Sequence, residues 1–310
     1  MRVLALHLGL LAVLGALHFA LPAYHHGNLA RVMVLASYGI GYNLLFGYAG
    51  LLSLGHALFF ASGMYGAGML VQHGGAGAGA AMLAGTVAAA AVAGLLALVA
   101  LRTRGVAFMI VTLMFAQAGY LTILYFGDWT GGDEGFVMAQ AGQMLGGIDL
   151  GTPGARYLAA LALFSACLMG SLALARAPFG RVLVAIRENE ERARMLGYDT
   201  QAHKRGAMIL SGAISGAAGA AYAILFGYVG ASFAEVQYSI LPLLWVLLGG
   251  AGTVLGPFVG ALFMFYLIDL ASGVTSAYML IAGVALVLLT LYAPQGLMGE
   301  VRRRLWRGLP

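Results

Sequence analysis

The sequence predicts an all-α, polytopic membrane protein, and three observations carry this prediction. Hydrophobic residues make up 62% of the 310 residues and charged residues only 9%, whereas soluble domains carry roughly 25% charged residues. Apolar segments recur along the chain, most of them close to the roughly 20 residues that a helix needs to cross the hydrocarbon core. Basic residues gather in a few short connectors, as the positive-inside rule predicts.

Ten apolar segments are candidates for membrane-spanning helices. They cover residues 3–21, 32–49, 53–72, 79–101, 105–126, 156–175, 206–227, 238–250, 255–272 and 276–293. In two neighbouring pairs, the second with the third and the eighth with the ninth, a glycine-rich joint separates the segments and one segment is short. The sequence therefore predicts about ten spans with two broken-helix joints, or eight full spans with re-entrant pieces. The first apolar run is too long for a typical signal peptide and no A-x-A site follows it, so we expect an uncleaved span.

The charged connectors predict the orientation of the chain. Residues 127–155 contain four acidic residues and neither lysine nor arginine, whereas residues 176–205 contain seven basic residues: Arg176, Arg181, Arg187, Arg192, Arg194, Lys204 and Arg205. Basic connectors belong in the cytoplasm, and the others are marked by Arg102, Arg104, Arg302, Arg303, Arg304 and Arg307. Ten spans then place both termini in the cytoplasm. Neither long connector could bury a core of its own, so we expect a single membrane domain over residues 1–310, with a cytoplasmic loop at 176–205.

Within this loop, residues 178–198 read PFGRVLVAIRENEERARMLGY and predict one amphipathic helix. Pro178 suits a helix start, and Gly197 suits a left-handed stop. One face repeats at spacings of three and four residues and is mostly apolar: Val182, Ile186, Asn189, Ala193 and Leu196. Opposite charges four residues apart support the helix in three pairs: Arg187 with Glu191, Glu188 with Arg192, and Glu190 with Arg194.

Two interpretations of this helix are open. One is an amphipathic helix that lies on the lipid headgroups, which usually has a basic polar face and large apolar anchors. The other is a helix that inserts into a groove of a partner protein. The alternating charges and the small Ala193 at the centre of the apolar face favour the partner protein.

The two glycine-rich joints share a pattern. Gly47-x-Ala49-Gly50 aligns with Gly249-x-Ala251-Gly252, and Gly55 aligns with Gly256 after a gap of one residue. The match indicates either a parallel internal repeat or a coincidence between two Gly/Ala-rich stretches. A broken helix in lipid frees backbone groups that protein or water must satisfy, so such breaks favour a place along a transport path. Candidate path residues are Asn43, Gly47, Gly50, Ser53, His56, Gln117, Gly249, Gly252 and Gly256.

The polar members of this set have a structural alternative. Asn43, Ser53, His56 and Gln117 equally suit hydrogen bonds that hold neighbouring helices together. Asp269 is an acid inside an apolar run, which suggests ion coupling. It lies near the end of its segment, however, and no basic residue shares that segment.

Other patterns exclude several classes of function. The single Cys167 excludes an intrachain disulfide and a cysteine metal site. No Walker A, G-x-S-x-G, zincin or kinase motif is present, so the sequence predicts neither an enzyme nor a cofactor. The net charge of +5 reflects the basic connectors rather than a nucleic-acid partner. The run Thr130-Gly-Gly-Asp-Glu-Gly135 on the acidic connector predicts a structured turn rather than a metal site.

Several segments resemble branched-chain amino-acid permeases of the LivM type. Residues 47–57, GYAGLLSLGHA, and residues 248–257, LGGAGTVLGP, resemble the two glycine-rich segments of this family, and residues 102–117 and 130–135 resemble further elements. The run from Arg181 to Gly197 resembles the family's cytoplasmic loop. Within it, residues 191–197 keep the E-x-A-x-x-x-G spacing of ABC importer permeases, with Arg192 in place of the second alanine. The resemblance extends from Asn43 to Gly299, in the family's order.

The resemblance implies a permease subunit of an ABC importer in the bacterial inner membrane that works by alternating access. The implied partners are a homologous second permease, two cytoplasmic ATPase subunits, a periplasmic substrate-binding protein and the lipid bilayer. The implied cargo is a branched-chain or related amino acid, and relatives that carry urea, short amides or aromatic acids are alternatives. An ion-coupled secondary transporter is the alternative outside the family. The implied residues of the ATPase-coupling helix are Arg181, Val182, Ile186, Arg187, Glu188, Asn189, Glu191, Ala193, Leu196 and Gly197.

Overall fold

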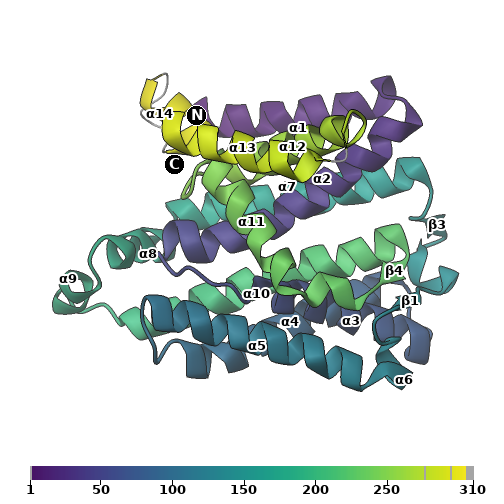
Figure 1. Cartoon of the computed structure of the whole chain (residues 1–310), viewed down its shortest axis with the longest axis horizontal. Helices are drawn as coiled ribbons and strands as arrows, with labels where there is room; N and C mark the ends of the chain where they lie inside the picture. Colours follow the sequence, from purple (N-terminus) through teal and green to yellow (C-terminus); the bar gives the residue numbers. More distant parts are fainter. Residues whose placement is uncertain (1, 276, 294, 305–310) are drawn as a thin grey trace.

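The computed structural model describes residues 2–275, 277–293 and 295–304, and these residues form a bundle of helices (Figure 1). Each of the ten apolar segments corresponds to a helix: α1 (Arg2–Ala20), α2 (Ala23–Asn43), α3 (His56–Gly74), α4 (Ala78–Ala100), α5 (Val106–Tyr125), α7 (Pro153–Arg176), α10 (Thr200–Phe226), α11 (Val236–Gly249), α12 (Gly256–Ser272) and α13 (Tyr278–Tyr292). The all-α prediction is confirmed. Arg307 of the basic tail lies outside the described residues.

Five helices in the described part of the chain are long and apolar enough to cross a membrane. They cover Tyr24–Tyr48, Ala78–Ala100, Val106–Tyr125, Pro153–Arg176 and Thr200–Phe226. The apolar helices Leu4–Ala20, α11 and α12 are shorter. The polytopic character is therefore confirmed, whereas the count of about ten spans stays a prediction.

The connectors gather at the two ends of the bundle (Figure 1). Helices α8 (Pro178–Glu188) and α9 (Glu190–Met195) project from one end, and the C-terminal α14 (Gly296–Arg304) lies toward the same end. The opposite end holds the short α6 (Gly127–Thr130) and the strands. The basic and acidic connectors are thus separated along the bundle, as the predicted orientation requires. The sidedness of the termini stays a prediction.

Helix α10 lies at the centre of the bundle and packs against α2, α3 and α4. Glycines allow this packing, because a Cβ on Gly216 would overlap the Cβ of Ala89, and a Cβ on Gly63 would overlap the carbonyl of Gly216. A Cβ on Gly219 would likewise overlap the carbonyl of Phe60. Small residues let membrane helices approach closely, which explains part of the high glycine content.

The acidic connector is folded against the bundle. Strand β1 (Phe136–Val137) pairs antiparallel with β4 (Tyr228–Val229), and β2 (Met144–Leu145) pairs antiparallel with β3 (Ile148–Asp149). Short 3-10 helices, η2 (Gln140–Gln143) and η3 (Ala231–Ala234), complete this end. The hydroxyl of Thr130 donates to the carbonyl of Ile123 at 2.6 Å, and Gly131, Gly132 and Gly135 have positive φ. The structured turn predicted for residues 130–135 is confirmed.

Candidate coupling loop and glycine-joint site

The predicted single helix over residues 178–198 is wrong, because the loop forms the two helices α8 and α9. Asn189 adopts an extended conformation, with φ −160° and ψ 100°, and ends α8. Its side-chain oxygen accepts a hydrogen bond from the backbone N–H of Arg192 at 2.9 Å, so it caps the start of α9. Asparagine favours this capping position over a helix interior. Gly197 has a φ of +88° beyond α9, so the predicted left-handed stop is confirmed.

The break at Asn189 also changes the ion pairs. Of the three predicted pairs only Glu190 with Arg194 forms, at 3.2 Å. Arg187 instead pairs with the adjacent Glu188 at 2.8 Å. The pairs that would cross the break do not form, because residues on either side of Asn189 no longer share one helical face.

Part of the apolar stripe packs the two helices of the loop against each other. Val182, Ile186 and Ala193 are buried in one small cluster that packs α9 against α8. Leu196, by contrast, is 71% exposed, and its neighbours Met195 and Tyr198 are 84% and 44% exposed. These three residues, which we call the tip patch, form the exposed apolar surface of the loop. The sequence pattern included only Leu196 of the three, since Met195 and Tyr198 lie off the predicted stripe. Arg181 and Glu191 are exposed and form no ion pair among the described residues.

A buried lysine anchors α9 to the bundle. The ammonium of Lys204, on α10, donates to the carboxylate of Glu190 at 2.5 Å, and the hydroxyl of Thr200 donates to the same carboxylate at 3.2 Å. Partial burial raises the pKa of Glu190, but the hydrogen bonds from Lys204 and Thr200 and the charges on Lys204 and Arg104 outweigh it. The pKa of Glu190 is therefore held below its usual value, and the carboxylate is ionised at neutral pH.

Arg187 connects α8 to both glycine-rich joints. Its guanidinium donates a hydrogen bond to the carbonyl of Gly47. A Cβ on Gly50 would lie 2.6 Å from Cγ of Arg187, and a Cβ on Gly252 would lie 3.0 Å from its Nη1. Gly50 and Gly252 also have φ of +71° and +74°, a conformation that glycine adopts without strain. The Arg187 side chain therefore lies against the backbone at Gly50 and at Gly252, where a residue larger than glycine would collide with it.

The two joints lie in direct contact. In the first, α2 ends in a π-helical turn, η1 (Leu44–Tyr48), and α3 begins only at His56. In the second, residues 250–255 separate α11 from α12. Asn43 bridges the joints: its Nδ2 donates to the carbonyl of Thr253 at 2.9 Å, and its Oδ1 accepts from the backbone N–H of Gly252 at 2.9 Å.

Glycine is required at the contact between the joints. A Cβ on Gly47 would overlap the Asn43 side chain and the backbone nitrogen of Gly252. Within the second joint, a Cβ on Gly249 would overlap the carbonyl of Gly256. The structure thus brings Asn43, Gly47, Gly50, Gly252 and Arg187 together. Whether the joints descend from an internal repeat stays a hypothesis.

The first joint continues into a buried polar cluster. His56 is fully buried, and its Nε2 lies 2.8 Å from the hydroxyl of Ser211 on α10, which donates to the carbonyl of Gly41 at 2.6 Å. The backbone N–H of Ala57 donates to Ser239 at 2.8 Å, and that of Leu54 donates to Thr112 at 3.2 Å. Side chains from other helices therefore satisfy the backbone donors that the broken helix leaves open.

His56 in this arrangement joins two helices, which is the structural alternative raised for it. Ser53 acts locally: its hydroxyl accepts from the N–H of Gly55 at 3.1 Å. The side chain of Gln117, on α5, is half-buried and forms no hydrogen bond with a described residue. Ser211 and Ser239 were missed, because one serine in an apolar helix produces no periodic signal.

Two further groups limit the chemistry of the site. The carboxylate of Asp269 accepts a hydrogen bond from the hydroxyl of Tyr24 at 3.2 Å, and no basic residue pairs with it in the described part of the chain. Among the described residues, no group of three or more His, Cys, Asp or Glu side chains could hold a metal ion. The site is thus built from glycines, hydroxyls, one amide, one imidazole and one guanidinium, which suits movement and packing rather than bond chemistry.

Comparison with known proteins identifies the family. Residues 26–291 match the family described as the permease component of the branched-chain amino acid transport system. The chain is 30% identical over 295 residues to the high-affinity branched-chain amino acid transport system permease protein LivM of Escherichia coli, covering 88% of this chain and 69% of that protein. It is 31% identical over 296 residues to the protein of the same name from Salmonella typhimurium, with the same coverage. No solved structure matches the chain. The chain therefore belongs to the family of branched-chain amino-acid transport permeases.

Proposed function

We propose that this chain, as one domain over residues 1–310, is the membrane-spanning permease subunit of an ATP-driven importer for branched-chain or related amino acids. Membership of the permease family supports this class of cargo. The sequence has no Walker A motif, so ATP hydrolysis would take place on separate cytoplasmic ATPase subunits. A homologous second permease and a periplasmic binding protein complete the proposed complex.

The proposed coupling surface is the tip patch of Met195, Leu196 and Tyr198. Its residues are 84%, 71% and 44% exposed at the end of a loop that projects from the bundle (Figure 1). Exposed apolar groups of this size mark interaction sites. The rest of the loop is braced by the Glu190–Lys204 pair and by the buried cluster of Val182, Ile186 and Ala193. A braced loop can transmit a push from the ATPase subunits instead of bending under it.

The contact of Arg187 with both joints is the observation that carries the proposal. Because Arg187 bonds the carbonyl of Gly47 and lies against Gly50 and Gly252, a displacement of α8 acts directly on the two broken helices. Packed interfaces of this kind switch between discrete arrangements rather than deform continuously. We propose that ATP-driven movement of the loop shifts the joints and opens the path on the alternate side.

The polar residues of the joints have a gating role in this proposal. Asn43 and His56 form hydrogen bonds within the protein and are buried, so they hold the joints closed instead of facing cargo. The path would open beside them when the contact between Gly47 and Gly252 separates. Gln117, whose side chain forms no hydrogen bond with a described residue, stays a candidate for contact with cargo.

The proposed arrangement in the membrane has about ten spans with both termini in the cytoplasm. The loop with α8 and α9 faces the cytoplasm, and the acidic connector at the opposite end of the bundle faces the periplasm (Figure 1). The folded connector, with the paired β1 and β4, would receive the binding protein there.

Two alternatives differ in cargo and in energy source. Related permeases that carry urea, short amides or aromatic acids would use the same loop and joints. In this proposal the loop and the joints transmit movement, and none of their residues is assigned to recognise a side chain of the cargo. An ion-coupled transporter would need a partnered acid in the membrane. The carboxylate of Asp269 accepts a hydrogen bond from the hydroxyl of Tyr24 and pairs with no basic residue in the described part of the chain.

Reconstitution decides among these functions. The chain is co-purified with candidate ATPases and a candidate second permease from its source organism and placed in vesicles with a candidate binding protein outside. Uptake of labelled leucine is then measured. We expect uptake that requires ATP and the binding protein, and that excess isoleucine or valine, but not urea, suppresses. Uptake driven by an ion gradient without ATP, and abolished by Asp269→Asn, would overturn the proposal.

A further inference from the structure

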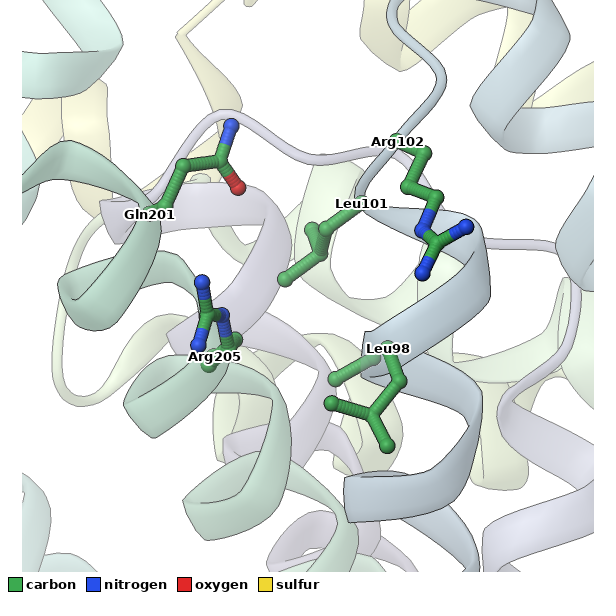
Figure 2. Close-up of a pocket in the computed structure, with 6 residues that line it drawn as sticks. Leu98, Leu101, Arg102, Gln201 and Arg205 are labelled. Carbon is green, nitrogen blue, oxygen red and sulfur yellow. The ribbon is translucent and has the colours of Figure 1, made fainter.

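A cavity of about 390 Å³ lies where α4 ends and α10 begins. It is lined by Ala97, Leu98, Leu101, Arg102, Gln201 and Arg205. Figure 2 shows two facing walls: the first turns of α10 supply Gln201 and Arg205, and the end of α4 with the residues that follow supplies Leu98, Leu101 and Arg102. Both helices are candidate membrane spans. The cavity therefore lies at the end of two adjacent candidate spans, and in a membrane this end would be close to the headgroup layer.

The rim of the cavity carries positive charge without a counter-charge. The guanidiniums of Arg102 and Arg205 both border the opening, and neither forms an ion pair with a described residue. Two acids of the adjoining loop, Glu190 and Asp199, are already engaged. Glu190 bonds Lys204 and Arg194, and the carboxylate of Asp199 accepts from the backbone N–H of Ala202 at 2.9 Å. An anion in the cavity would therefore meet two free guanidiniums and the amide of Gln201.

The floor of the cavity is apolar and continues along the spans. Ala97 and Leu101 are buried, whereas Leu98 is 54% exposed. One turn further along α4, Leu95 is 68% exposed, and Ile209 of α10, which lies near Gly94 of α4, is 39% exposed. An apolar surface thus leads from the charged rim toward the hydrocarbon-facing part of the two helices. A free phosphate would use only the rim, but an acyl chain would cover this surface as well.

We propose that this cavity binds an anionic phospholipid. The phosphate of the headgroup lies between Arg102 and Arg205, with Gln201 as a further donor, and an acyl chain runs along Leu98 and Leu95. Arginine suits phosphate because its planar guanidinium can donate two parallel hydrogen bonds, and basic pockets between membrane helices bind anionic headgroups in this way. The site requires only that the chain spans a membrane, so it stands apart from the proposed cargo and from coupling to ATPase subunits.

Lipid retention in native mass spectrometry tests the site. Purified chain is exchanged into detergent with phosphatidylglycerol or phosphatidylcholine, and bound lipid is measured for the unmodified chain and for the double variant Arg102→Gln/Arg205→Gln. We expect selective retention of phosphatidylglycerol, and an affinity about thirtyfold lower in the variant, because two arginine–headgroup attractions are lost. The matched control Arg181→Gln/Arg192→Gln removes the same charge from the exposed loop and should retain lipid normally.

Two further arms separate lipid from other anions. Leu98→Asn leaves both arginines in place and should still weaken phosphatidylglycerol, since the acyl chain loses its surface. Millimolar inorganic phosphate should fail to displace the lipid. Normal lipid affinity in Leu98→Asn, or displacement by phosphate alone, would reduce the cavity to a simple anion site and overturn the proposal.

A partner subunit is the remaining competitor for this surface. If Arg102→Gln/Arg205→Gln releases the ATPase subunits while phosphatidylglycerol binding is unchanged, the cavity is a protein-docking site and the proposal is wrong. Because the two arginines are exposed and unpaired, the double variant should fold. If the double variant does not fold, Leu98→Asn still provides an independent test of lipid binding.

Discussion

The guanidinium of Arg187, on the projecting loop, donates a hydrogen bond to the carbonyl of Gly47 in the π-helical end of α2. This bond joins the surface that a partner can reach to a broken helix inside the bundle. We predict that Arg187→Gln uncouples the complex: ATP hydrolysis persists, while uptake per ATP falls about tenfold, the scale expected when one charge-assisted hydrogen bond is lost. Both rates are measured on the same vesicles.

The control for this prediction is Arg192→Gln on the same loop. Arg192 is exposed, and its side chain forms no hydrogen bond or ion pair with a described residue, so uptake per ATP should not change. If hydrolysis and uptake fall together in Arg187→Gln, the arginine serves assembly rather than transmission, and the uncoupling prediction is wrong.

The bridge made by Asn43 predicts a loss of stability. Asn43→Leu removes two hydrogen bonds and leaves the carbonyl of Thr253 and the N–H of Gly252 without their partner. Each buried group left unsatisfied costs about 1–3 kcal/mol, so we expect unfolding to be easier by about 2–6 kcal/mol in total. Thermal unfolding of the purified chain in detergent measures this change.

The same helix offers a matched control. Asn28 also lies on α2, and the buried nitrogen of its side chain has no hydrogen-bond partner among the described residues. Asn28→Leu should therefore leave the unfolding temperature unchanged or raise it. Equal losses in the two variants would mean that the bridge between the joints adds no stability of its own.

Hydropathy and glycine spacing were enough to predict the ten apolar helices and the two joints. Helices are required in lipid because every backbone group must be satisfied internally, so each long apolar run corresponds to a helix. Glycine marks the joints for a similar reason, since Gly50 and Gly252 have positive φ that other residues rarely adopt. The apolar helices and the glycine joints depend on hydropathy and glycine content, and a short stretch of sequence is enough to show both properties.

The contacts that define the site depend on long-range or competing interactions. Asn43 and Gly252 are 209 residues apart, and neither carries a local signal that they meet. Asn189 fitted the helical stripe by spacing, but its tendency to cap a helix prevailed and divided the loop. The apolar stripe favoured insertion into a groove of a partner protein, but Val182 and Ile186 pack against Ala193 of the same loop. The other two members of the stripe, Asn189 and Leu196, are exposed.

The Glu190–Lys204 pair predicts a pH dependence of stability. The folded-state pKa of Glu190 lies below its ordinary value of 4.5, so its contribution is present above that pH and is lost as the pH falls through the folded value. We expect Glu190→Gln to unfold more easily by about 1 kcal/mol at pH 7, and the difference from the unmodified chain to vanish on acidification below pH 4.5. Thermal unfolding of both chains across this pH range measures it; a difference that persists at the acidic end would contradict the assignment.

The tip patch predicts where the ATPase subunits bind. Leu196 is 71% exposed and Glu191 is also exposed, so Leu196→Glu and Glu191→Lys should leave the unfolding temperature unchanged. Each should nevertheless reduce co-purification of the ATPases, Leu196→Glu by about tenfold or more, because a charge would be buried without a partner at the interface.

The control for this surface is at the other end of the bundle. Val137 on β1 is 75% exposed, so Val137→Glu adds the same charge at a comparably open position on the acidic connector. It should leave the bound ATPases in place, because this end faces away from α8 and α9 (Figure 1). If the Leu196→Glu variant retains its bound ATPases as the Val137→Glu variant does, the tip patch has another purpose. Since Val182, Ile186 and Ala193 are buried, the loop would then have to bind through its charged residues alone.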